Sequence, residues 1–189
     1  NTLEHVSQFY LTGNGNIYAV TENPEPVFDV FRLKGKTTEK VYTTSQKITS
    51  LEVDAHQQGM MVHQQNPEGS SPEVLYLDFN TKTAWYLNEI TSMPFQQAFT
   101  DVISEGSIYF LRLWIHQAKD DTSPVDIWYG NDNRLEEKFL PSTREVYYVW
   151  EPKNKKLQPL GNKQLTKSAN IRNERFFLSL DPYLLEDYT

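Results

Sequence analysis

Residues 74–87 read Val-Leu-Tyr-Leu-Asp-Phe-Asn-Thr-Lys-Thr-Ala-Trp-Tyr-Leu and give the clearest sign of local structure in this chain. Both ends of the stretch are rich in aliphatic and aromatic residues, which are the types that favour strands. Three polar residues, Asn80, Thr81 and Lys82, separate the two ends and are typical of a turn. The stretch therefore predicts an antiparallel β-hairpin.

Similar hairpins are expected at 27–42, 125–140 and 146–160. A second type of hairpin, with a glycine just before its second strand, is expected at 9–20, 51–62 and 99–110. The glycines of this second type are Gly15, Gly59 and Gly106, which lie 44 and 47 residues apart. The two types alternate, so the chain repeats about every 45 residues with about four strands in each repeat.

A period of this length with four strands is the pattern of a β-propeller blade. Residues 74–87 resemble the outer hairpin of β-propeller repeats and share the loosely kelch-like order of aromatic residue, Asp, polar turn, Trp and Leu. Residues 146–157 are similar. The Gly-Gly pair of kelch repeats and the Trp-Asp ending of another propeller class are both absent. The resemblance therefore implies an architecture and no specific family.

We expect an all-β fold of repeated four-stranded antiparallel sheets, β-propeller-like, with a β-sandwich as the alternative. One repeat domain would cover residues 1–189, as approximate repeats and a tail: 6–46, 47–95, 96–141, 142–180 and 181–189. The hairpin at 146–160 fits this division badly, because it directly follows another hairpin of the same type. Either the repeat is irregular there, or a hairpin of the native chain is missing.

Composition narrows the classes of partner. The formal net charge is −7, which favours solubility and makes nucleic acid an unexpected partner, since phosphate binding needs a concentrated basic face. The chain has no cysteine, so disulfides and thiolate metal sites are excluded. No stretch approaches 18 apolar residues, so no membrane-spanning helix is expected. An extracytoplasmic location (cell surface, periplasmic or secreted) is expected because it fits the polar, cysteine-free chain. The start at Asn1 rather than Met suggests a processed or truncated product.

A divalent metal is the one cofactor that the sequence suggests. Glu52, Asp54 and His56 alternate, so they would share one face of a strand, and His63 would approach them from the next strand. A solvated hairpin face explains the same pattern. The polar residues 126–137 do not have the spacing of a calcium loop and are expected to form a turn.

Aromatic residues are the stronger lead to a binding site, and the candidates lie on expected strands: Trp85, Trp114, Trp128, Tyr129 and Trp150. Adjacent aromatic residues in a strand point to opposite faces of the sheet. Double-sided burial between neighbouring sheets explains such pairs, and an exposed platform that binds a sugar or a protein is the alternative.

The sequence favours a non-catalytic recognition module that binds a protein or glycan through loops and aromatic residues. Loops 115–124 and 64–72 are the expected contact segments. Hydrolase signals are missing, because no Gly-x-Ser-x-Gly elbow and no cysteine nucleophile occur. The alternatives are a propeller-type hydrolase or lyase with an acidic or metal site, and a structural portion of a larger multidomain protein.

Overall fold

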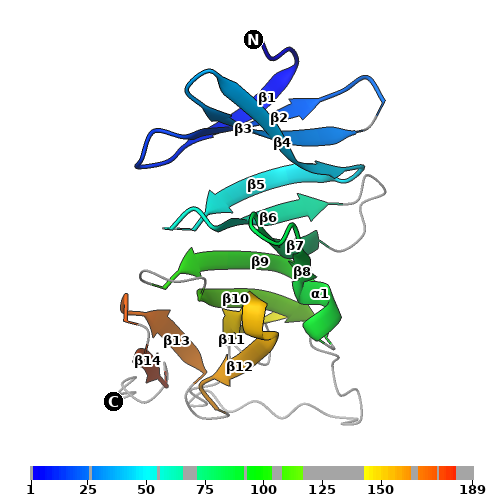
Figure 1. Ribbon diagram of the computed structural model, residues 1–189. Helices are drawn as coiled ribbons and strands as arrows, with labels where there is room; N and C mark the ends of the chain where they lie inside the picture. The colour runs from blue at the N-terminus through cyan, green and yellow to red at the C-terminus, as the bar shows by residue number, and fades with distance from the viewer. Residues whose placement is uncertain are drawn as a thin grey trace, which may run out of the picture. The chain divides into compact units, whose positions relative to one another are not determined.

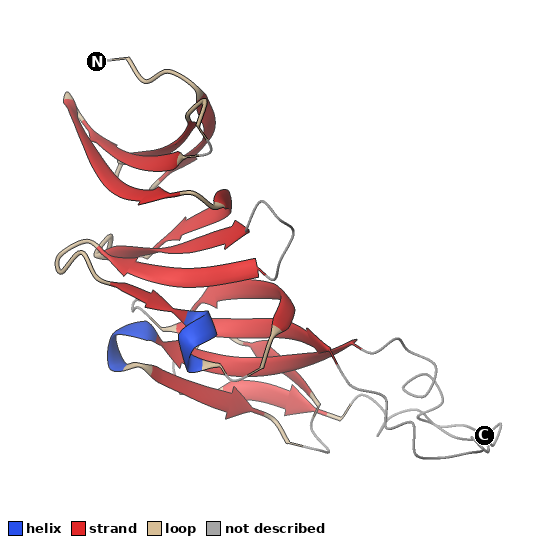
Figure 2. Cartoon of the chain, turned by 90° about the vertical axis from the view of Figure 1, so that its right-hand side faces the viewer, coloured by secondary structure: helices blue, strands red, loops and turns tan. Residues whose placement is uncertain are grey.

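Strands make up nearly all of the regular structure in this computed structural model (Figure 2). The structure describes residues 2–25, 27–54, 56–65, 72–91, 93–103, 108–116, 143–162, 166–173 and 175–181. Helices within this part are limited to α1 (Leu87–Ile90) and the short 3₁₀ helix η1 (Pro152–Asn154). The expected all-β class is confirmed. No helix in the described ranges has the length and apolar character needed to cross a membrane.

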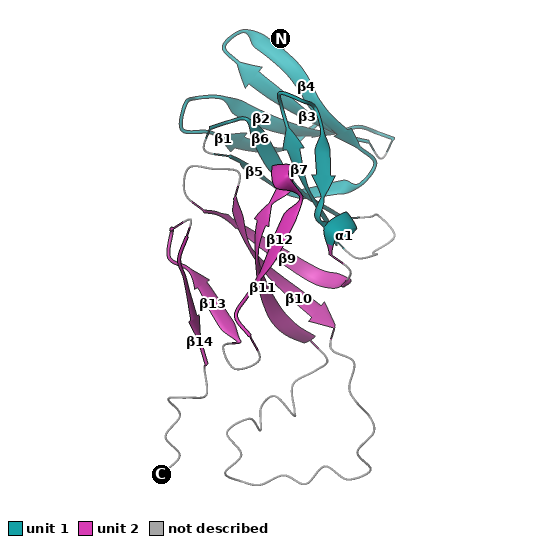
Figure 3. Ribbon diagram, turned by 60° about the horizontal axis from the view of Figure 1, so that its bottom comes forward, with its two compact units in different colours: residues 1–90 teal, residues 91–189 magenta. Residues whose placement is uncertain are grey.

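The chain divides into two compact units, Asn1–Ile90 and Thr91–Thr189 (Figure 3). The first unit holds two four-stranded antiparallel sheets whose strands follow chain order (Figure 1). The first sheet consists of β1 (Val6–Leu11), β2 (Ile17–Glu22), β3 (Phe28–Lys34) and β4 (Thr37–Thr44). The second sheet consists of β5 (Lys47–Val53), β6 (Gly59–Gln65), β7 (Pro72–Asp78) and β8 (Ala84–Tyr86).

Turn chemistry explains this simple order. Gly15 and Gly35 have φ values of 83° and 59°, which glycine adopts without the steric cost of a Cβ atom. These two residues close the β1–β2 and β3–β4 turns, so each strand pairs with the next one in the chain. A Greek-key sandwich instead needs connections that cross between sheets. The repeated meander of the first unit therefore favours the propeller-like expectation over the sandwich alternative.

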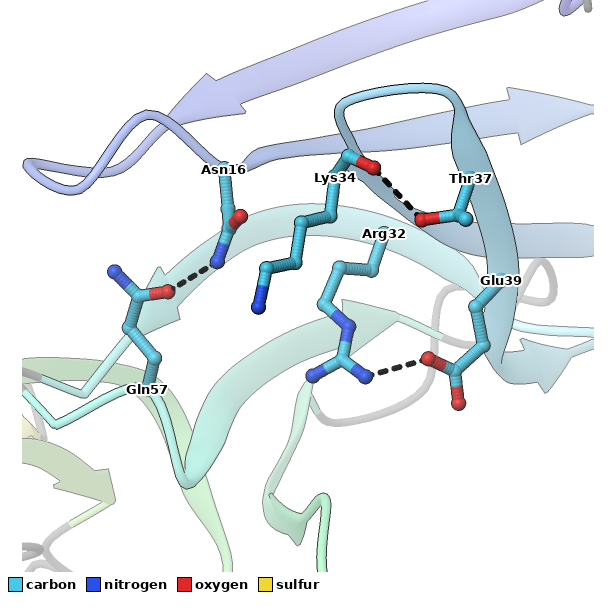
Figure 4. Close-up of polar contacts among 6 residues, drawn as sticks. All are labelled: Asn16, Arg32, Lys34, Thr37, Glu39 and Gln57. Atoms are coloured by element: carbon cyan, nitrogen blue, oxygen red, sulfur yellow. Dashed lines mark hydrogen bonds and ion pairs between the residues drawn. The ribbon is translucent and has the colours of Figure 1, made fainter.

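The two sheets of the first unit share one hydrophobic core. The first sheet contributes Tyr18, Val20, Phe28 and Val30, and the second contributes Ile48, Leu51, Met60, Val62, Leu75 and Leu77. Alternation along each strand places these side chains on the facing surfaces. Polar contacts add to the junction, since the Asn16 side-chain amide donates to Gln57 Oε1 at 2.6 Å (Figure 4). Arg32 pairs with Glu39 and lies 5.5 Å from the Phe79 ring centroid.

The second unit contains a third four-stranded sheet and a two-stranded hairpin. The sheet consists of β9 (Phe95–Val102), β10 (Tyr109–His116), β11 (Thr143–Glu151) and β12 (Lys156–Leu160). The hairpin consists of β13 (Lys167–Asn170) and β14 (Phe177–Leu180). Phe177 of the hairpin stacks on Phe110 of the sheet with ring centroids 6.2 Å apart. This contact joins the hairpin to one face of the third sheet.

The structure accounts for the irregular hairpin at 146–160. Strand β10 pairs directly with β11, from Tyr109 opposite Trp150 to His116 opposite Thr143. The hairpin is therefore the outer half of the third sheet, which reaches residue 160, whereas the sequence pattern ended that repeat at 141. Two strands can pair across the intervening segment because loop-closure entropy rises only slowly with loop length. The hairpin expected at 125–140 lies outside the described residues.

Gly59 gives a test of the packing inside the second sheet. A Cβ atom at this position would overlap the Tyr76 hydroxyl and the Leu77 carbonyl oxygen. We expect Gly59→Ala to lower the free energy of unfolding by about 1–3 kcal/mol, as overpacking of a full core does. Urea unfolding of the purified chain measures the change.

Gly13→Ala is the matched control, because a Cβ atom there meets nothing within 4 Å. It should change stability by less than about 0.5 kcal/mol. Equal effects of the two substitutions would contradict the packing described for Gly59.

Candidate functional site

The four residues of the suggested metal site are not brought together. Strand β5 ends at Val53, so Asp54 and His56 lie in the turn that follows it and no longer alternate with Glu52. Asp54 is buried and accepts hydrogen bonds from the Tyr76 hydroxyl at 2.8 Å and from the Gln58 backbone N–H at 2.9 Å. These bonds are the structural reason for a carboxylate at this turn.

His63 lies on β6, opposite Ser50 and not opposite Glu52. Burial lowers the pKa of His63 to about 4, so its imidazole is neutral at physiological pH. Across the described ranges, no group of three or more His, Cys, Asp or Glu side chains could hold a metal ion. A divalent metal at these positions therefore has no geometric support.

The predicted aromatic residues have different environments. Trp150 is completely buried beside Tyr109, with ring centroids 6.4 Å apart, so it has no surface to offer a ligand. Trp85 is half-buried and packs against Tyr76 at 6.0 Å. Trp128 and Tyr129 lie outside the described residues. Among the predicted tryptophans that the structure describes, Trp114 is the most exposed, with 37% of its surface accessible.

Trp114 belongs to a cluster on the third sheet that we call the aromatic patch: Phe99, Arg112, Trp114 and Glu145. Register explains the cluster, because Arg112 lies opposite Phe99, and Trp114 lies opposite Glu145. The Phe99 and Trp114 ring centroids are 6.4 Å apart. The Arg112 guanidinium lies 4.6 Å from the Phe99 ring centroid, within cation–π range.

A hydrogen-bond network holds Trp114 in place. Its indole N–H donates to Glu145 Oε1 at 3.0 Å. The other oxygen of Glu145 accepts bonds from the Tyr147 hydroxyl at 2.5 Å and from Lys167 Nζ at 2.9 Å. The indole orientation is therefore fixed by a carboxylate that is itself held from two sides.

The protonation states suit this network. Burial opposes ionisation of Glu145, but hydrogen bonds from Tyr147, Lys167 and Trp114 outweigh it and hold the pKa of Glu145 below its ordinary value. Burial raises the pKa of Tyr147, and the neighbouring Glu145 carboxylate raises it further. At neutral pH the carboxylate is charged and the phenol is protonated, which is the arrangement that the hydrogen bonds require.

The sheet beneath the patch is buried on its opposite face. Along β10, Leu111, Leu113 and Ile115 are buried, whereas Arg112 and Trp114 alternate with them on the opposite face. The Leu-Arg-Leu-Trp-Ile-His run at 111–116 carries this alternation in the sequence. Phe99 and Glu145 were missed by sequence reasoning, because only the register of three strands shows that they flank Trp114.

The first unit also has a polar cleft of about 440 Å³, lined by Tyr42, Thr43, Thr44, Ser45, Gln46, Gln64, Glu73, Tyr86 and Glu89. Its side chains bond mainly to one another. Tyr42 donates to Gln64, and both Gln64 and Gln46 donate to the same oxygen of Glu73. The exception is the amide oxygen of Gln46, which is buried without a hydrogen-bond partner in the described structure. Tyr42, Gln46, Gln64 and Glu73 are thus engaged with one another, and the Tyr42–Gln64 bond joins the two sheets. The aromatic patch is therefore the better candidate site.

Comparisons with known proteins bear on the fold. No protein-family model matches this chain, and no curated protein matches it. Among solved structures, the chain is similar to the β-propeller domain of the trilobed protease from Pyrococcus furiosus, which has an open velcro topology. The TM-score is 0.55 at 11% sequence identity, and the match covers 85% of this chain and 45% of that one.

At this identity the likeness shows the fold alone, and the chain spans less than half the length of the structure it matches. The match agrees with the successive four-stranded meanders described above. It also confirms the resemblance to β-propeller repeats that residues 74–87 carry. The chain therefore has a β-propeller-like fold of repeated four-stranded antiparallel sheets.

Proposed function

We propose that this chain is a non-catalytic recognition module that binds a protein partner through the aromatic patch. The supporting observation is a pair of exposed rings, Phe99 and Trp114, held on neighbouring strands of one sheet. Protein interfaces concentrate their binding energy in a few residues, among which tryptophan and arginine are over-represented. Trp114 and Arg112 supply both types at adjacent positions on one face.

A protein is favoured over a glycan because of how Arg112 lies. Its guanidinium stacks over Phe99, so one face of that ring is covered and cannot stack on a sugar. Lys167 borders the patch, where it pairs with Glu145, and its side chain is 50% exposed. A charged residue at this place resembles the polar rim around an apolar interface core. The Trp114 ring is oriented in advance by the Glu145 network, which reduces the entropy lost on binding.

The fold likeness to a protease's propeller domain does not extend to its chemistry, and we propose no peptidase activity. An extracytoplasmic location stays a prediction, as does the role of loops 115–124 and 64–72, most of which lie outside the described residues.

Trp114→Ala tests the proposed site. We expect proteins captured from a native extract by the immobilised chain to be lost with this variant. Each captured protein is then purified and titrated by calorimetry. Its Kd should rise by at least tenfold, which corresponds to about 1.4 kcal/mol.

Met93→Ala is the matched control, because Met93 is 36% exposed in the same unit and lies outside the patch. It should leave the Kd unchanged. Equal affinity of the chain and Trp114→Ala would contradict the proposed site. If instead a glycan binds the chain and does not bind the Trp114→Ala variant, the ligand of the aromatic patch is a carbohydrate and not a protein.

Glu145→Gln tests whether the charged carboxylate supports the patch. Because the pKa of Glu145 is lowered in the folded chain, its stabilising effect is present above the ordinary value of 4.5 and is lost as pH falls through the lower folded value. We expect the variant to be less stable by on the order of 1 kcal/mol at pH 7. The difference should shrink as pH falls below 4.5 in urea unfolding. A difference that does not change with pH would show that the charge of Glu145 has no role.

A further inference from the structure

Arg112 has an aromatic residue on each of its four sides. Across the strands it lies opposite Phe99 and Tyr147. Along β10, Phe110 and Trp114 share its face of the sheet, because side chains alternate in a strand. The raised pKa of Tyr147 keeps its phenol protonated at neutral pH. The nearest neighbours of Arg112 in the sheet therefore supply no negative charge to balance the guanidinium.

The carboxylates on this face do not pair with Arg112 either. Glu145 and Asp101 lie at positions diagonal to it in the strand register. Both oxygens of Glu145 already accept hydrogen bonds from other side chains. Within the described ranges, the Arg112 guanidinium forms no ion pair and no hydrogen bond with another side chain. Arg112 is exposed, so its charge and its N–H donors are open to a ligand.

Its position over Phe99 prepares the guanidinium for a carboxylate. The guanidinium lies 4.6 Å from the Phe99 ring centroid, so the ring excludes water from one side and strengthens attraction to a negative charge. A planar guanidinium can donate two parallel N–H bonds to the two oxygens of one carboxylate. Arg112 is thus oriented by its stacking for a contact that the described structure leaves unmade.

Charge favours a carboxylate over a phosphate. A phosphate group carries about two negative charges and needs more than one cation. Lys167, the other cation beside the patch, is already paired with Glu145. The single unpaired charge of Arg112 matches the single charge of an aspartate or glutamate side chain.

We propose that the protein segment bound by the aromatic patch presents an aspartate or glutamate side chain to Arg112 and an aliphatic side chain to Trp114. The inference rests on the proposed function and names the chemistry of the partner. Arg112 and Trp114 are alternate residues of β10, so their Cα atoms are roughly 6.8 Å apart. Alternate residues of an extended partner segment have the same spacing. The acidic and aliphatic residues of the partner are therefore expected to be separated by one residue.

A random peptide library displayed on phage is the first probe, selected on the immobilised chain. A parallel selection on Trp114→Ala identifies peptides that bind elsewhere, and these are discarded. The remaining peptides should share an Asp or Glu two positions away from a Leu, Ile or Val. The proposal is overturned if no peptide depends on Trp114, or if the dependent peptides are no richer in acidic residues than the library.

Arg112→Gln then measures the contact itself, by calorimetry with a selected peptide. We expect the Kd to rise by about tenfold or more. Replacing the acidic residue of the peptide by its amide should have the same effect. The two changes together should cost no more than either one, because both remove the same contact. A peptide with phosphoserine at the acidic position should bind more weakly, and tighter binding would assign the site to phosphate and overturn the proposal.

Arg144→Gln is the matched control, because it removes the same charge from the same sheet. Arg144 is exposed and lies opposite Ile115, on the face away from the patch, so the Kd should stay unchanged. The thermal unfolding midpoint shows whether each variant is folded. Arg112→Met, which keeps an aliphatic contact with Phe99, serves if Arg112→Gln does not fold.

The two proposals fail in different ways. Peptides that require Trp114 and bind Arg112→Gln with unchanged Kd would overturn the acidic contact and leave the proposed function standing. Captured proteins that bind Trp114→Ala as tightly as the original chain would instead contradict the aromatic patch itself.

Discussion

The packing of one sheet on the next is the interaction on which the first unit depends. A four-stranded meander has two faces, and its inner residues are removed from water only when another sheet lies against them. Tyr18 and Val20 from the first sheet meet Met60 and Leu75 from the second in one core, and all four are completely buried. The strand pairing within each sheet would leave these side chains in water, so the face-to-face contact stabilises both sheets together.

The same constraint explains where the molecule is open. Sheet faces with a neighbour carry the core, and a sheet face without one shows its apolar residues, as Phe9 and Leu11 do. The third sheet is an intermediate case, because the hairpin β13–β14 covers Phe110 but leaves Phe99 and Trp114 half exposed. The proposed protein site therefore lies where one face of the third sheet is only partly covered.

Two hydrogen-bonded carboxylates, Asp54 and Glu145, hold neighbouring groups in fixed positions. Asp54 is held by Tyr76 and by the turn that it closes, and Glu145 is held by Tyr147, Lys167 and Trp114. In both places a carboxylate is stabilised by several donors, which lowers the cost of removing it from water. At Asp54 the result is a buried turn, and at Glu145 it is an oriented indole at the surface.

Local sequence patterns were sufficient to predict most of the strands and turns and the all-β fold class. Alternating aromatic and aliphatic runs with polar or glycine turns predicted the hairpins at 9–20, 74–87 and 146–160, because strand geometry and turn conformation depend on neighbouring residues. Three features were decided only by the tertiary structure. The third sheet takes its outer hairpin from residues 143–160. Trp150 is buried whereas Trp114 is exposed, and Phe99 and Glu145 lie beside Trp114. These depend on strand register and on which sheet covers which face, and those contacts join residues far apart in the chain.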